Sequence, residues 1–137
     1  MLSRTPLTLV ALITMLALSA TLPAQQPPQS ATQFYMAYKA AFHKAKSMNE
    51  LFPYMAKEKL EQVKSASAAD LKMMWSMAKD LYVFSGEKVV KETATPSGAT
   101  LEVQAVDPEK NNYRATVTLV KQNNAWKFLE EDWSPAK

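Results

Sequence analysis

Few residues of this chain could do acid–base chemistry, and they are scattered. The single histidine, His43, lies nine residues after Phe34, about half a turn round a helix from the apolar face that Phe34 marks. A general base needs a dry pocket and an orienting partner, and the residues around His43 indicate neither. We therefore expect a histidine on the surface.

Carboxylates are the second candidates, because burial raises the pKa of a carboxyl group toward neutrality. Glu130, Glu131 and Asp132 form a run near the C-terminus, where the alternation of a strand must expose at least one of them. Asp107 and Glu109 fall in a polar loop, and we expect both groups to be solvated. The strand positions that we assign to the inner face hold no acid: Leu101, Val103, Ala105, Tyr113, Ala115, Val117 and Leu119. The sequence thus predicts no catalytic residue.

Composition excludes several other kinds of site. Without cysteine, the 137 residues can form no disulfide and no thiolate site, and two glycines are too few for a phosphate-binding loop. The 16 basic and 13 acidic residues give a net charge of +3, so we expect no nucleic-acid partner. Met36 and His43 share the back of the first predicted helix, but no methionine-rich or histidine-rich cluster supports a Cu(I) site. We predict no metal and no cofactor.

Six methionines follow residue 24, at positions 36, 48, 55, 73, 74 and 77. A single methionine usually fills an irregular gap in a core. Met73 and Met77 lie four residues apart on one flank of a predicted helix, and Met36 lies on the back of the first helix. These three are our candidates for an apolar surface that contacts a partner or forms a homodimer.

The aromatic residues admit two interpretations. They either fill a closed core or line the mouth of a pocket, where flat faces and polar tips suit a small amphipathic ligand. In the second case the candidate pocket residues are Tyr38, Met74, Trp75, Tyr113, Val117 and Trp126. The sequence leaves both interpretations open.

Residues 1–24 have the order of a secretory signal peptide. A short basic region ends at Arg4, the uncharged apolar stretch 7–22 follows, and Pro23-Ala24 offers a small residue for cleavage. About 16 apolar residues are short for a membrane span, so we expect cleavage after Ala24 and no stable span afterwards. Cleavage after Ala20 and an uncleaved anchor are the alternatives. We expect residues 25–30 to be a disordered leader and the chain to be secreted or periplasmic, since a chain without cysteine suits an oxidising compartment.

Residues 30–82 read as three helices. Capping signals begin at Ser30, Ser47 and Ser67, and each opens a segment with apolar residues at helical spacing. Pro53 interrupts the second segment. The expected buried faces are Phe34, Tyr38, Ala41, Phe42 and Ala45, then Phe52, Ala56, Leu60 and Val63, then Leu71, Met74, Trp75, Ala78 and Tyr82.

After Phe84 the apolar pattern changes to the alternation of strands. We expect strands over 83–95, 99–106, 113–119 and 125–133. Pro96-Ser97-Gly98 and Asn123-Asn124 suit tight turns, because glycine and asparagine tolerate the left-handed conformation. Three helices packed on an antiparallel sheet of about four strands form one α+β domain over residues 31–134.

Three segments carry a resemblance to a known superfamily: the opening helix 31–42, the segment 50–55, and the ending 124–133 with Trp-x-Phe before a second tryptophan. In these three segments the chain resembles the nuclear-transport-factor-2-like superfamily, which is also called the cystatin-like α+β cone. It resembles most closely the small secreted bacterial branches of unknown function in that superfamily. The resemblance implies a sheet that curves around the first helix, often with an apolar pocket at the cone mouth. The superfamily includes isomerases, dehydratases, binding modules and dimerising adaptors, so the fold leaves function open.

The sequence favours a secreted or periplasmic binding or accessory module without catalysis, which holds a small apolar ligand in the cone or dimerises. A small-molecule isomerase, dehydratase or hydrolase that uses the same pocket is the competing class. Tyr38, Tyr113 and a carboxylate around an open void would favour the enzyme. A closed cone with Met73 and Met77 outside would favour the interaction module.

Overall fold

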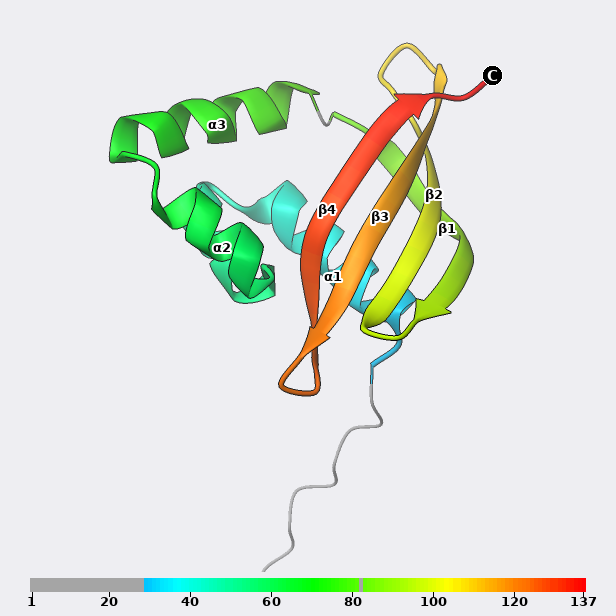
Figure 1. Ribbon diagram of the computed structural model, residues 1–137. Coiled ribbons are helices and arrows are strands. Elements are labelled where there is room, and N and C mark those ends of the chain that lie inside the picture. The colour runs from blue at the N-terminus through cyan, green and yellow to red at the C-terminus, as the bar shows by residue number, and fades with distance from the viewer. Residues whose placement is uncertain (1–28, 82) are drawn as a thin grey trace, which may run out of the picture.

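The computed structural model describes residues 29–81 and 83–137. The predicted signal peptide, residues 25–28 of the predicted leader, and Tyr82 lie outside the described residues. The elements are, in chain order, α1 (Ala31–Lys44), the 3-10 helix η1 (Met48–Tyr54), α2 (Lys57–Lys64), α3 (Ala68–Leu81), β1 (Ser85–Thr95), β2 (Gly98–Val106), β3 (Asn112–Gln122) and β4 (Ala125–Pro135). Helices precede one four-stranded sheet, so the predicted α+β class is confirmed (Figure 1).

The second predicted helix is divided in two. Pro53 lies inside η1, and the chain leaves the helical conformation at Met55 and Ala56 before α2 begins at Lys57. Met55 forms a parallel bridge with Phe128, and the Ala56 amide donates to the Phe128 carbonyl oxygen over 2.7 Å. The described residues therefore form four helices rather than three, because this step pairs with the edge of β4.

The predicted capping box begins α1. The Gln33 amide donates to the Ser30 hydroxyl oxygen over 3.1 Å, and the Ser30 amide donates to the Gln33 side-chain oxygen over 3.0 Å. The Thr32 amide and hydroxyl both donate to one carboxylate oxygen of Glu92 over 2.8 Å. These bonds satisfy amides that a helix start leaves free, and they tie this end of α1 to β1.

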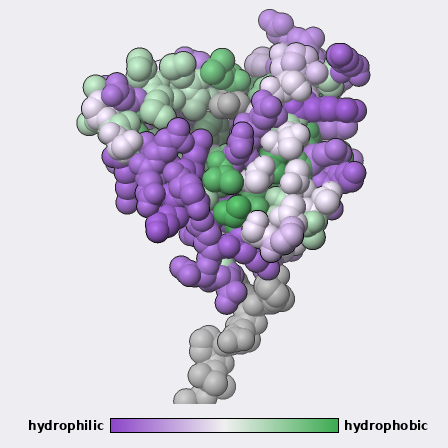
Figure 2. Space-filling view, in the orientation of Figure 1, coloured by the Kyte–Doolittle hydropathy of each residue, from purple (hydrophilic) through white to green (hydrophobic). Residues whose placement is uncertain are grey.

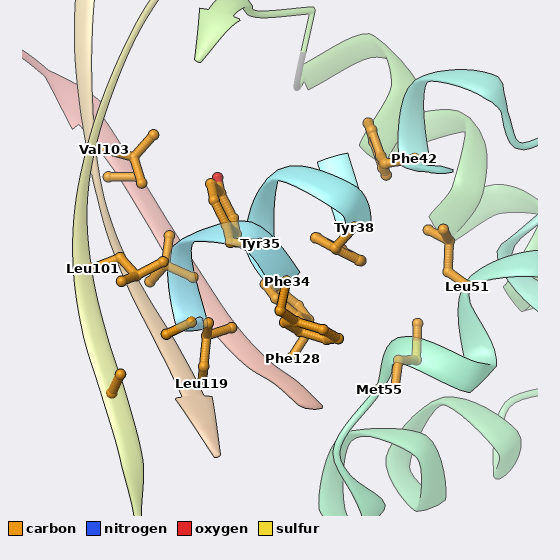
Figure 3. Close-up of a cluster of buried hydrophobic side chains, with 14 of the residues drawn as sticks. Phe34, Tyr35, Tyr38, Phe42, Leu51, Met55, Leu101, Val103, Leu119 and Phe128 are labelled. Atoms are coloured by element: carbon orange, nitrogen blue, oxygen red, sulfur yellow. The ribbon is translucent and has the colours of Figure 1, made fainter. Parts of the chain in front are cut away.

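The side chains of α1 are buried on two sides of the helix. Phe34, Tyr38 and Phe42 on the predicted face are buried, and so are Tyr35 and Lys39. In Figure 3, Tyr35 lies on the side of the sheet, whereas Tyr38 and Phe42 lie on the side of η1. The single apolar stripe that the sequence predicts is therefore too narrow, because the sheet covers one side of α1 and the other helices cover a second.

The sheet is an antiparallel meander in the order β1-β2-β3-β4, and it curves around α1 (Figure 1). Its inner face has the alternation that the sequence predicts, because Leu101, Val103, Ala115, Val117 and Leu119 are all buried. These side chains and those of α1 fill the space inside the curve (Figure 3).

Both predicted tight turns are present, but the left-handed conformation expected at Gly98 is not found there, since its φ is not positive. Gly98 begins β2 at a place where an added Cβ would lie 2.0 Å from the Leu119 carbonyl oxygen, so the close approach of β3 requires glycine there. Asn123 and Asn124 have φ angles of 52° and 62°, which is the left-handed conformation that asparagine tolerates.

A bulge in β4 decides which of its side chains face inward. Leu119 and Thr118 of β3 pair with Phe128 and Glu130, which leaves Leu129 as an extra residue in β4. The alternation of inward and outward side chains therefore shifts by one residue beyond Leu129.

This shift turns one acid of the C-terminal run inward. Glu131 pairs with the buried Val117, and directly paired residues of antiparallel strands share a face. The Glu131 side chain is only 7% exposed, whereas Glu130 and Asp132 are exposed. The predicted solvated acidic edge is confirmed for Glu130 and Asp132 and is wrong for Glu131, because the bulge breaks the alternation.

None of the residues of α3 is buried. Leu71, Trp75 and Ala78 of its predicted face pack against the core, but Met74 of the same face is 39% exposed. Figure 2 shows hydrophobic surface over α3 beside the hydrophilic surface of α2. Within residues 29–81 and 83–137, no helix combines the length and the hydropathy that crossing a bilayer requires.

Candidate functional site

A polar cluster lies inside the domain, where α1 meets β4. The Tyr35 hydroxyl donates to one carboxylate oxygen of Glu131 over 2.8 Å, and the Lys39 ammonium group donates to the other over 3.3 Å. The Lys39 and Glu131 side chains are 3% and 7% exposed. The Lys39 ammonium group also lies 4.9 Å from the centre of the Phe42 ring. A buried cation and a buried carboxylate thus compensate each other.

Burial is the main reason that the pKa of Tyr35 lies far above its ordinary value, and the negative charge of Glu131 raises it further. The phenol therefore keeps its proton at neutral pH and serves as a hydrogen-bond donor. Since Glu131 already accepts from Tyr35 and Lys39, the cluster orients α1 on β4 rather than presenting a poised acid or base.

His43 is exposed, as predicted, and has a structural partner. Its Nε2 lies 2.7 Å from a carboxylate oxygen of Glu87, and these side chains are 42% and 9% exposed. The Lys79 ammonium group donates to the main-chain oxygens of Phe42 and His43 over 3.1 and 3.4 Å. The C-terminal end of α1 is thus held to β1 through Glu87 and to α3 through Lys79.

A groove of about 350 Å³ opens beside the polar cluster, between the helices and β4. Tyr38 and Phe128 stack in it, with ring centres 4.4 Å apart and planes 16° apart. Its polar residues are Lys59, Glu130 and Glu131. Most of the wall is apolar and includes Tyr38, Phe42, Leu51, Met55, Met74 and Phe128, several of which Figure 3 shows around a common space.

The predicted pocket residues do not lie in one cavity. Tyr38 and Met74 line the groove, and Val117 is fully buried in the core. Trp126 lies at the β3–β4 turn, where its Nε1 donates to the Gln29 carbonyl oxygen over 2.7 Å.

The other two predicted pocket residues pack against phenylalanines elsewhere. Trp75 on α3 meets Phe42 edge-on with ring centres 5.4 Å apart. Tyr113 on β3 meets Phe84 with ring centres 4.8 Å apart. The structure thus places the six candidates around the core, and two of them share the groove.

The predicted partner-surface residues are exposed. Met73 and Met77 are 57% and 54% exposed on α3, and Met36 is 39% exposed on α1. Leu81, at the C-terminal end of α3, is 65% exposed and extends the row that Met73 and Met77 begin at four-residue spacing.

The arrangement that would favour an enzyme is not formed. Tyr38 stacks on Phe128 and Tyr113 packs on Phe84, so the two tyrosines face different surroundings. The inward carboxylate of Glu131 bonds to Tyr35 instead. Within the described residues, no three side chains of histidine, aspartate or glutamate gather as metal ligands would.

Tyr35, Lys39 and Glu131 are not among the site residues that the sequence predicts. Tyr35 and Lys39 lie four residues apart on one side of α1, and this spacing is a signal that could have indicated a second buried face. Glu131 carries no such signal, because its direction depends on the bulge at Leu129.

The fold and the groove define a small α+β protein with an apolar recess where its helices meet the edge of an antiparallel sheet. Comparisons with family models, curated proteins and solved structures found nothing that matches this chain.

Proposed function

We propose that this chain is an exported binding module without catalysis, which holds a small apolar ligand in the groove between its helices and β4. The observation that carries the proposal is the groove itself: about 350 Å³ of space beside a stacked Tyr38–Phe128 pair. Ligand pockets typically have volumes of about 300–1,000 Å³ and apolar walls, so the space suits a compact molecule.

The charges around the groove favour a ligand without net charge. Glu131 is compensated by Lys39, 3.3 Å away. Lys59 and Glu130 add one positive and one negative group to the wall. An ionic ligand would have to displace a balanced arrangement, whereas an apolar ligand only covers carbon surface.

The same contacts argue against catalysis. Tyr35 keeps its proton because burial raises its pKa, and Glu131 accepts from both Tyr35 and Lys39. A general base in this groove would need a free carboxylate or phenolate with a pKa near the working pH. The role of Tyr35, Lys39 and Glu131 is therefore to position α1 on β4.

Titration with N-phenyl-1-naphthylamine, a neutral fluorophore, tests the proposal. Met74 lines the groove, whereas Met73 points outward and is 57% exposed. We expect saturable fluorescence enhancement with the wild-type chain. Met74→Trp fills the groove and weakens binding about tenfold or more, which corresponds to about 1.4 kcal/mol.

Met73→Trp is the matched control, because it makes the same substitution one residue away on the same helix. It should leave the affinity unchanged within about twofold, since no groove contact is lost. Equal effects of Met74→Trp and Met73→Trp, or no saturable binding by the wild-type chain, would exclude the groove as the site.

A second function, pairing of two copies through α3, is favoured by the row Met73, Met77 and Leu81. The row is symmetric about Met77, so two antiparallel copies of α3 would place Met77 against Met77 and Met73 against Leu81. Each side chain is 54–65% exposed. Burying about half of such a side chain contributes about 1 kcal/mol, so the pair would be weak.

Sedimentation velocity over a concentration series tests this second candidate. We expect a reversible dimer that Met77→Lys abolishes, because the substitution places two ammonium groups together at the centre of the pair. Ser76→Lys, the same charge change on the neighbouring residue, should leave the dimer intact. A monomer at all concentrations would refute the pairing.

The membership of the nuclear-transport-factor-2-like superfamily stays a prediction, supported by the curved antiparallel sheet around α1. Export likewise stays a prediction, and it depends on the order of residues 1–24.

A further inference from the structure

A second hollow, of about 330 Å³, lies away from the groove, between the C-terminal end of α3, the start of β1 and the β2–β3 loop. Tyr113 and Trp133 line it together with Phe84. The Phe84 ring centre lies 4.8 Å from that of Tyr113 and 4.4 Å from that of Trp133. Phe84 is buried and the other two rings are partly exposed, so the cluster presents an aromatic wall to the hollow.

The charged groups of this hollow all have one sign. Asp80 of α3 and Asp107 of the β2–β3 loop line it, and none of its described lining residues is a lysine, arginine or histidine. A hydrogen bond from the Asn111 side chain is the main reason that the pKa of Asp107 is lowered. Asp107 therefore carries its negative charge at neutral pH.

A cation of the protein lies near the aromatic wall but is already compensated. The Lys39 ammonium group is 5.7 Å from the centre of the Trp133 ring and 3.3 Å from a Glu131 carboxylate oxygen. Glu131 thus balances Lys39, whereas Asp80 and Asp107 form no ion pair within residues 29–81 and 83–137, and the partners of the Asp107 carboxylate there are the neutral amides of Glu109 and Asn111.

From the aromatic wall and the two aspartates, we propose that this hollow binds a small organic ammonium ion. Aromatic faces attract cations through their quadrupole, and a quaternary ammonium ion also has an apolar surface that aromatic carbon can cover. Asp80 and Asp107 supply the opposite charge. The site is separate from the groove, and its failure would leave the proposed apolar ligand untouched.

The test compares choline with 3,3-dimethylbutan-1-ol, which has the same shape and no charge. The chain as recovered from an exporting host is labelled with ¹⁵N, and the three indole N–H signals are followed by NMR. Trp133 lines the hollow, whereas Trp75 and Trp126 do not and serve as internal controls. Trp75→Phe and Trp126→Phe variants assign the signals.

We expect choline to shift the Trp133 signal in a saturable way at millimolar concentration. The neutral alcohol should bind about fivefold or more weakly, and NaCl at the same ionic strength should not reproduce the shift. Equal shifts with choline and the alcohol, no shift of Trp133, or a shift at Trp75 or Trp126 instead would overturn the proposal.

A pair of variants tests the role of charge. Asp80→Asn should weaken choline binding about threefold, as the loss of one exposed charge does. Asp132→Asn removes the same charge from the outer face of β4, next to Trp133 in sequence, and should leave binding unchanged. Equal affinities for the Asp80→Asn variant and the wild type would overturn the proposal.

Discussion

Replacing Glu131 with glutamine would remove the carboxylate that lies 3.3 Å from the Lys39 ammonium group. The two side chains are 7% and 3% exposed, so water screens their attraction little. Removal of one partner from a buried ion pair costs about 3–5 kcal/mol. We therefore expect Glu131→Gln to lower the free energy of unfolding by about this amount, out of the roughly 5–15 kcal/mol that a domain has.

The assay is urea unfolding followed by tryptophan fluorescence. Glu130→Gln is the matched control, since it makes the same change at the exposed neighbouring residue and should cost less than about 0.5 kcal/mol. The double variant Lys39→Met with Glu131→Gln keeps an acceptor for the Tyr35 hydroxyl and removes both charges. It should recover part of the loss, with a coupling energy of about 1–3 kcal/mol.

Two results would show that no buried ion pair joins α1 to β4. If Glu131→Gln cost no more than Glu130→Gln, the Glu131 carboxylate would not be buried as the bulge in β4 places it. If the coupling energy between positions 39 and 131 were zero, the ion pair would not orient α1 on β4.

Three further predictions concern pH, backbone and export. Because burial raises the pKa of Tyr35, the phenol loses its proton at lower pH in the unfolded chain than in the folded one. The free energy of unfolding should therefore fall above pH ~10 by about 1.4 kcal/mol per pH unit. Tyr35→Phe should remove that part of the decline, and a urea midpoint that declines with pH as in the wild type would contradict this prediction. Gly98→Ala should destabilise by about 2–3 kcal/mol, because its Cβ would meet the Leu119 carbonyl oxygen. Gly86 has a φ of 63° and open space at its Cβ position, so Gly86→Ala should cost about 1 kcal/mol. A lower melting temperature for Gly86→Ala than for Gly98→Ala would be inconsistent with the close approach of β3 to Gly98. The intact mass of the exported chain should correspond to a chain that begins near Gln25, and a mass of the full-length chain would count against the signal peptide.

Much of the fold could be predicted because local rules and tertiary packing agree. The Ser30–Gln33 capping box fixes the start of α1, and the alternation of Leu101, Val103 and Val117 fixes the inner face of the sheet. Asn123 and Asn124 mark the last turn through their tolerance of positive φ. In each case a few neighbouring residues determine the outcome.

The polar cluster could not be predicted, because it depends on residues far apart in the chain. The inward direction of Glu131 follows from one extra residue in β4, and sequence alternation does not reveal such a bulge. The burial of Lys39 follows from that direction, since Glu131 supplies its counter-charge. The groove is likewise a product of helix packing, and only Tyr38 and Met74 of the predicted pocket residues line it.

Methionine-methyl NMR during titration with N-phenyl-1-naphthylamine tests the proposed groove most directly. The described methionines fall into two groups of three, which act as reporters and controls within one chain. We expect the fluorophore to shift the methyl signals of the three that line the groove, Met48, Met55 and Met74. We expect no shift at the three that do not line it, Met36, Met73 and Met77. Shifts confined to the second group, or no shifts at all, would exclude the groove as the binding site.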